Sequence, residues 1–175
     1  MMSTALLIID VQEAMFAYPD MKLFDEEGVL ERISSLLDKA RLAGVPVIYI
    51  QHTEEEGEFV KGIPTWEISS RIAPQAGETI IEKTTPDSFH LTGLQEELER
   101  LGVTELIICG MQTDYCVNAT SRRAHSLGYS SVLVKDAHST FDDNHLTGEE
   151  IVKQHNDALG SGIAALRSEQ EVTFR

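Results

Sequence analysis

The sequence predicts an α/β domain in which helices cover both faces of a mostly parallel sheet. Two observations lead to this prediction: short apolar runs recur along the chain, and segments with helical spacing lie between them. Runs that are apolar throughout suit strands buried on both faces, as in parallel sheets. Alternating strands and helices need crossover connections, which place helices on both sides of the sheet. We therefore expect a single three-layer αβα domain over residues 1–175, with a sheet of about six strands.

The individual elements follow in chain order. Apolar runs predict strands over residues 4–9, 45–50, 79–82, 106–109 and 131–134, with a last short strand over 172–174. Apolar residues spaced by three and four predict helices over 29–40 and 91–101, and helical character extends over 113–127, 149–159 and 162–166. Residues 51–77 form the longest irregular segment, and loops of that length are often functional. The succession is typical of a Rossmann-like sheet.

Charge and composition limit the possible functions. The chain carries 14 basic and 29 acidic residues, a net charge of −15, and such a field repels nucleic acid at low salt. No run approaches the roughly 18 apolar residues that span a bilayer, and residues 1–10 lack the basic start of a secretory signal. Two cysteines are too few for a disulfide framework. We therefore predict a cytoplasmic protein with a small-molecule substrate and with no nucleic-acid or membrane partner.

Reactive side chains follow the ends of three predicted strands. Asp10 ends the first strand, Lys83 ends the third, and Cys116 comes a few residues after the fourth. In an open parallel sheet, ligands bind beyond the carboxyl ends of the strands, where the strand order reverses. An acid, an amine and a thiol are therefore expected to converge at this edge, and together they can form an activated nucleophile.

The position of Cys116 alone allows two interpretations. Near the amino end of the predicted helix over residues 113–127, the helix dipole and the Lys83 ammonium would lower the pKa of the thiol, and Asp10 could accept its proton. A free cysteine is also often inert core. Cys109, inside an apolar strand, is interpreted in that second way.

Three longer motifs occur in order along the chain: Leu6-Leu-Ile-Ile-Asp-Val-Gln12, Glu82-Lys83 before Ser88-Phe89, and Gly110-Met-Gln-Thr-Asp-Tyr-Cys-Val117. Together they resemble the isochorismatase-like cysteine hydrolases, which include nicotinamidase-related amidohydrolases, and the match covers nearly the whole chain. The resemblance implies that Cys116 is the nucleophile, Asp10 the general base and Lys83 the group that supports both. It also implies a non-proline cis peptide near Met111-Gln112 that aims an N–H at the oxyanion.

The resemblance further implies hydrolysis of a small amide through an acyl-cysteine intermediate. Isochorismatase proper cleaves a vinyl ether, and some members of that branch lack the cysteine, so Cys116 favours amide chemistry. Nicotinamidases hold a metal through an Asp-x-His pattern that is missing from Gln51-His-Thr-Glu-Glu-Glu56, so neither a metal nor another cofactor is expected. Because family members commonly assemble as dimers or larger oligomers, we expect a homo-oligomer.

Seven further residues are predicted to contact the substrate. Five are aromatic and suited to clamping a flat, apolar molecule: Phe16, Trp66, Phe89, Tyr115 and Phe141. The other two, His52 and His138, follow strands and could bind a polar group of the substrate. Each of the seven has an alternative structural role, because aromatic residues also fill cores and a histidine at a strand end often only holds a wall or a loop.

Four other classes of protein share some features with this sequence. A receiver-like phosphoacceptor needs acids beside Asp10 to bind Mg²⁺, and a dinucleotide-binding module needs glycine-rich phosphate turns. Neither pattern is present. A redox protein would use Cys109 with Cys116, although a strand would bury Cys109. A catalytically silent binding protein of the same fold is the fourth, and the intact set of Asp10, Lys83 and Cys116 argues against it.

Overall fold

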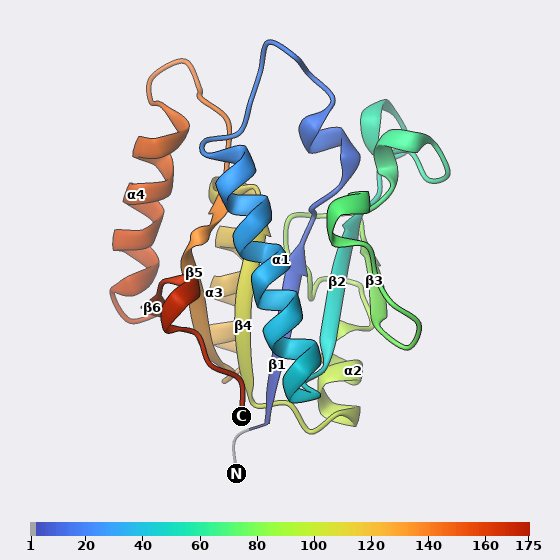
Figure 1. Cartoon of the computed structure of the whole chain (residues 1–175), viewed down its shortest axis with the longest axis vertical. Coiled ribbons are helices and arrows are strands. Elements are labelled where there is room, and N and C mark those ends of the chain that lie inside the picture. The colour runs from blue at the N-terminus through green and yellow to red at the C-terminus, as the bar shows by residue number, and fades with distance from the viewer. Residues whose placement is uncertain (1–2) are drawn as a thin grey trace.

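A computed structural model describes residues 3–175 and shows one six-stranded sheet (Figure 1). Its strands are β1 Thr4–Ile9, β2 Val47–His52, β3 Thr79–Lys83, β4 Glu105–Met111, β5 Ser130–Ser139 and β6 Ala165–Arg167. They lie in the order β3-β2-β1-β4-β5-β6, and every pair of neighbours is parallel. The predicted α/β class with about six strands is confirmed, and the sheet is wholly parallel.

Four α-helices cover the two faces: α1 Glu26–Ala43, α2 Leu94–Arg100, α3 Asn118–Ser126 and α4 Gly148–Gly160. In the part of the chain that the structure describes, none of the helices is long and apolar enough to cross a membrane. Short 3-10 turns occupy Glu13–Phe16, Gly57–Phe59, Pro64–Trp66, Ser70–Ile72 and Glu169–Glu171, and a π-helical turn occupies Thr113–Val117.

The alternating side chains of the strands build two cores. Leu6 and Ile8 of β1 point to the face that α1 covers, whereas Leu7 and Ile9 point to the face covered by α2, α3 and α4 (Figure 1). Strands buried on both faces explain why the runs read as continuously apolar in the sequence. The helices end where the sequence indicates: Gly44 takes a left-handed conformation at φ 68° and its N–H bonds the last turn of α1.

Two predicted elements near the end of the chain are wrong. Residues 162–166 are not helical, because Gly162 has φ 107° and the chain then enters β6, which pairs with Val132–Val134 of β5. Residues 172–174 are not a strand. Val172 instead turns its side chain into the core on the α1 side, where it is 2% exposed.

Candidate active site

The candidate site lies at the carboxyl edge of the sheet, where the strand order reverses between β1 and β4. Asp10 follows β1, His52 is the last residue of β2 and Lys83 is the last residue of β3. Cys116 lies in the π-helical turn after β4. Four segments far apart in the sequence therefore meet at one point, as the rule for open parallel sheets predicts.

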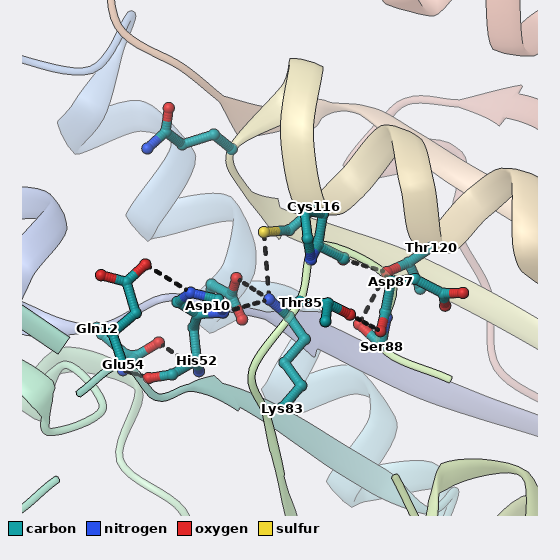
Figure 2. A network of polar contacts seen from close by, with 12 residues as sticks. Asp10, Gln12, His52, Glu54, Lys83, Thr85, Asp87, Ser88, Cys116 and Thr120 are labelled. Carbon is teal, nitrogen blue, oxygen red and sulfur yellow. Dashed lines mark hydrogen bonds and ion pairs between the residues drawn. The ribbon is translucent and has the colours of Figure 1, made fainter. Parts of the chain in front are cut away.

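Lys83 connects the acid to the thiol. Its Nζ lies 2.8 Å from Asp10 Oδ2 and 3.2 Å from Cys116 Sγ, and Figure 2 shows the ammonium between the two groups. Asp10 and Lys83 are each 1% exposed, and Cys116 is 9% exposed. The second carboxylate oxygen of Asp10, Oδ1, is buried and has no hydrogen-bond partner among the described residues. An acceptor without a partner at the centre of such a cluster is available to take a proton.

Backbone geometry at the ends of β1 and β4 determines where these groups lie. Asp10 adopts a left-handed conformation at φ 52°, and its N–H bonds the carbonyl of Ile50 in β2 at 3.0 Å. Gly110 has φ 121°, and a Cβ at that position would overlap the carbonyl oxygen of Ile9. Only glycine allows the two strands to approach so closely. The Met111–Gln112 peptide bond, at the end of β4, is a non-proline cis bond.

Two hydroxyl groups hold the loop after Lys83 against the helix after Cys116. Ser88 Oγ lies 2.8 Å from Thr120 Oγ1, and the N–H of Ser88 bonds the same Thr120 oxygen at 3.1 Å. Both residues are fully buried and appear beside Lys83 and Cys116 in Figure 2. They fix the distance between the segment that carries the lysine and the segment that carries the thiol.

The expected low pKa of the Cys116 thiol is wrong. Burial raises the pKa of Cys116 to about 12; the negative charge of Asp10 adds to the rise, and Lys83 opposes it. The rise in thiol pKa that burial causes is larger than the fall in pKa that the single neighbouring ammonium causes. The resting thiol is therefore protonated at neutral pH and needs a base to become a nucleophile.

A cavity of about 310 Å³ opens over the thiol, which is near the small end of ligand-binding cavities. Its walls combine acidic, apolar and neutral polar groups, and they comprise Asp10, Met15, His52, Glu54, Phe59, Thr84, Pro86, Gln112, Tyr115 and Cys116. Of the seven predicted substrate contacts, only His52 and Tyr115 line it. Gln112, predicted to border the oxyanion, lines it as well.

The remaining four aromatic residues lie outside this lining. Phe89 is in the core and stacks on Tyr129 with ring centroids 5.8 Å apart. Phe16 and Phe141 pack against the core on the α1 side. Trp66 uses its indole N–H to bond Thr53 Oγ1 at 3.0 Å, outside the cavity wall. The two aromatic rings that do line the cavity are those of Tyr115 and Phe59.

His138 is also a structural residue rather than a cavity residue. It is 1% exposed, and its ring lies 2.7 Å from Thr113 Oγ1 and 2.8 Å from Asn156 Oδ1. Burial lowers the pKa of His138 to about 4, so the ring is neutral at neutral pH. It links the π-helical turn that carries the thiol to α4.

Sequence reasoning missed Met15, Glu54, Phe59, Thr84 and Pro86 in the cavity wall. Glu54 and Phe59 lie in the long segment over residues 51–77, whose length was the available signal. The direction in which each side chain of that segment points is set by contacts such as the bond from the N–H of Glu54 to the carbonyl of Phe59 at 2.9 Å.

Both ring nitrogens of His52 are engaged by protein groups. Nδ1 lies 2.9 Å from Lys83 Nζ, and Nε2 lies 2.9 Å from Glu54 Oε1. Over residues 3–175, no group of three or more His, Cys, Asp or Glu side chains could hold a metal ion.

Comparisons with known proteins agree with the geometry of the site. The family model of the isochorismatase domain matches residues 4–158. Streptothricin hydrolase from Streptomyces noursei is 39% identical over 139 residues, which are 79% of this chain and 50% of that protein, so the chain spans about half of its length. Nicotinamidase 3 from Arabidopsis thaliana is 31% identical over 154 residues, 79% of this chain and 74% of that protein.

A solved structure resembles the whole fold as well. The crystal structure of an isochorismatase from Pseudomonas putida KT2440 superposes with a TM-score of 0.90 at 30% identity, over 97% of this chain and 89% of that one. The family model covers both the strands of the sheet from β1 to β5 and the motif around the thiol. The chain belongs to the isochorismatase family of hydrolases.

Proposed function

We propose that this protein hydrolyses the C–N bond of a small amide, with Cys116 as nucleophile, Asp10 as general base and Lys83 as the charge that supports both. One observation carries the proposal: Lys83 Nζ lies 2.8 Å from the acid and 3.2 Å from the thiol, at the base of the cavity. Similarity to a nicotinamidase supports an amide as the substrate class.

The first half of the reaction forms an acyl-cysteine. Asp10 takes the thiol proton, and the sulfur attacks the carbonyl carbon to form a C–S bond. The proton on Asp10 passes to the leaving nitrogen as the C–N bond breaks, so ammonia or an amine departs. Lys83 stabilises the thiolate, since its charge lowers the thiol pKa.

The second half of the reaction releases the carboxylic acid product. Asp10, again a carboxylate, takes a proton from water, and the hydroxide attacks the thioester carbon as the C–S bond breaks. The thiolate regains the proton from Asp10. We infer that backbone groups at Met111 and Gln112 stabilise the oxyanion in both halves, because Gln112 lines the cavity beside the thiol.

His52 and Tyr115 are the predicted substrate contacts that remain. Tyr115 is 59% exposed at the cavity wall, so its ring is available to cover a flat substrate. None of the Arg side chains that the structure describes lines the cavity, and the ammonium of Lys83 is already bonded to Asp10. The site therefore favours neutral amides over substrates whose carboxylate would face Asp10.

The test follows ammonia release from a panel of small amides that includes nicotinamide, after chelation of metals. Wild type and Cys109→Ala are expected to turn over one or more amides, whereas Cys116→Ala is expected to be inactive. Cys109 is a matched control because it is a buried free thiol in the interior of β4. Rapid quenching followed by intact mass measurement is expected to find the acyl adduct in wild type alone. Equal turnover by Cys116→Ala would disprove the mechanism.

The oligomeric state and the cellular location stay predictions. The homo-oligomer expected from the resemblance is checked by light scattering, with Tyr18, Met21 and Phe24 as exposed apolar residues that an interface would cover. The cytoplasmic location is checked by fractionating the cells that make the protein.

A further inference from the structure

Lys83 has a third neighbour, partly buried, in addition to the acid and the thiol. His52 Nδ1 lies 2.9 Å from Lys83 Nζ, comparable to the 2.8 Å separation between Nζ and Asp10 Oδ2. An ammonium group has three N–H donors and no acceptor. Asp10, Cys116 and His52 therefore use all three donors, and each of these partners must accept. It follows that Nδ1 of His52 is unprotonated and that its ring proton is on Nε2.

Glu54 stabilises that same form of the ring. His52 Nε2 lies 2.9 Å from Glu54 Oε1, and an ionised carboxylate only accepts hydrogen bonds. The ring nitrogen that faces Glu54 must therefore be the donor, in agreement with the requirement set by Lys83. A carboxylate that fixes a histidine tautomer in this way is a recurrent device in enzymes.

Packing holds the His52 ring in place. Its edge contacts the Phe59 ring with centroids 5.4 Å apart and an interplanar angle of 82°. The backbone of His52 is bonded on both sides by the carboxamide of Gln12, at 2.8 Å through its N–H and 2.9 Å through its carbonyl. The His52 side chain is 13% exposed, whereas that of Glu54 is 49% exposed at the cavity wall. Figure 2 shows the side chains of Glu54, His52, Lys83 and Cys116 linked in that order by polar contacts.

We propose that His52, with its tautomer fixed by Glu54, is a positioning residue that aims the Lys83 ammonium between Asp10 and Cys116. The proposal rests on the proposed function of Lys83. Without an acceptor at Nδ1, one N–H of a lysine that is 1% exposed loses its partner. The ammonium is then free to rotate and to shift toward the charged Asp10 carboxylate, so its contact with the thiol is no longer fixed.

Two substitutions at one position separate the hydrogen bond from the presence of the ring. His52→Asn places an amide oxygen where Nδ1 lies, so it keeps an acceptor for Lys83. His52→Leu has a similar size and removes the acceptor. At Glu54, Glu54→Gln keeps an acceptor for Nε2, whereas Glu54→Leu removes one of the two partners that hold the ring proton on Nε2.

The readout is the rate of alkylation of Cys116 by iodoacetamide at one fixed pH, followed at that residue by peptide mass spectrometry. Lys83 lowers the pKa of the thiol, and an adjacent opposite charge changes a pKa by about one unit or more. Loss of a fixed Lys83 contact is therefore expected to slow alkylation by about tenfold or more in His52→Leu, and in Lys83→Met as the reference. His52→Asn is expected to stay within about threefold of wild type.

This readout needs no substrate, so it stays valid if the protein hydrolyses none of the amides tested. With an active substrate, kcat is expected to fall in His52→Leu by about 100-fold and to recover in His52→Asn. Circular dichroism verifies folding. Should His52→Leu not fold, Glu54→Leu against Glu54→Gln makes the same comparison, with slower alkylation expected only in Glu54→Leu. Alkylation of His52→Leu at the wild-type rate, while Lys83→Met is slow, would overturn the proposal, as would equal slowing in His52→Leu and His52→Asn.

Discussion

Removing one charge of the buried pair formed by Asp10 and Lys83 is expected to lower the free energy of unfolding more than removing both charges. The two charges are 2.8 Å apart, and each residue is 1% exposed. At an effective dielectric constant of about 20, charges at that distance attract by roughly 6 kcal/mol, which offsets the cost of taking them out of water. Lys83→Met removes the partner of Asp10 Oδ2, and Asp10 Oδ1 has no hydrogen-bond partner among the described residues.

The expected magnitudes follow from that asymmetry. Lys83→Met is expected to lower the free energy of unfolding by about 3–5 kcal/mol. Asp10→Asn is expected to lower it by at least about 2 kcal/mol, because the buried ammonium loses its charged partner. The double variant, Lys83→Met with Asp10→Asn, contains neither charge, and it is expected to be more stable than the variant with Lys83→Met alone. The coupling between the two sites should reach about 2 kcal/mol or more.

The assay is urea unfolding at neutral pH, followed by circular dichroism at one protein concentration for all variants. Lys61→Met is the matched control, since Lys61 pairs with Glu82 at 2.6 Å but both side chains are exposed, at 62% and 40%. Loss of that surface pair is expected to cost under about 1 kcal/mol. Additive effects of Lys83→Met and Asp10→Asn, within about 0.5 kcal/mol, would refute the view that the two charges depend on each other.

Three further predictions test other parts of the molecule. Asp10→Asn is expected to abolish hydrolysis yet speed the alkylation of Cys116 by iodoacetamide at pH 8, because the Asp10 charge raises the pKa of the thiol. Gly110→Ala is expected to destabilise the fold by several kcal/mol in urea unfolding, since its Cβ would overlap the backbone of β1, whereas Gly93→Ala has open space and is expected to be near neutral. Between about pH 6.5 and 4, the unfolded chain binds a proton that buried His138, with its pKa lowered to about 4, does not. The free energy of unfolding is therefore expected to fall by up to about 3 kcal/mol as the pH drops through that window, and less in His138→Gln.

Each of these has an outcome that would contradict it. Slower alkylation in Asp10→Asn would mean that Asp10 favours the thiolate. A stable Gly110→Ala variant would mean that β1 and β4 separate at little cost. Equal pH dependence in wild type and His138→Gln would assign the loss of stability in acid to other groups.

The sequence predicted the sheet and the convergence of Asp10, Lys83 and Cys116 because both depend on strong, local patterns. Continuous apolar runs such as Thr4–Ile9 are distinctive of strands buried on both faces, and residues just beyond such runs meet at one edge of a parallel sheet. The error at β6 has the opposite origin. Ala165–Arg167 contains three residues that include an exposed alanine and an exposed arginine, and it is a strand only because β5 supplies hydrogen bonds to it.

The cavity wall could not be predicted for a related reason. Phe89 and Tyr115 both lie near the trio in the sequence, yet one is buried against Tyr129 and the other is 59% exposed over the cavity. The side of a loop on which a ring lies depends on tertiary contacts that leave no periodic signal. Phe59 illustrates this, because it reaches the cavity through a 3-10 turn within the long irregular segment.

The sign of the thiol pKa shift has the clearest physical cause. The favourable effects on Cys116, a neighbouring lysine and a helical turn, could be inferred from residue types, whereas the opposing effects depend on depth and distance. Burial is the largest influence and raises the thiol pKa, and Asp10 raises it further. The charge of Asp10 disfavours the thiolate form of Cys116, so Asp10 does not stabilise the thiolate electrostatically. Its position suits instead a general base that takes the proton of the thiol. In the mechanism proposed above, Asp10 takes the proton from the thiol, and this one transfer produces both the thiolate nucleophile and the protonated Asp10 that later gives the proton to the leaving nitrogen.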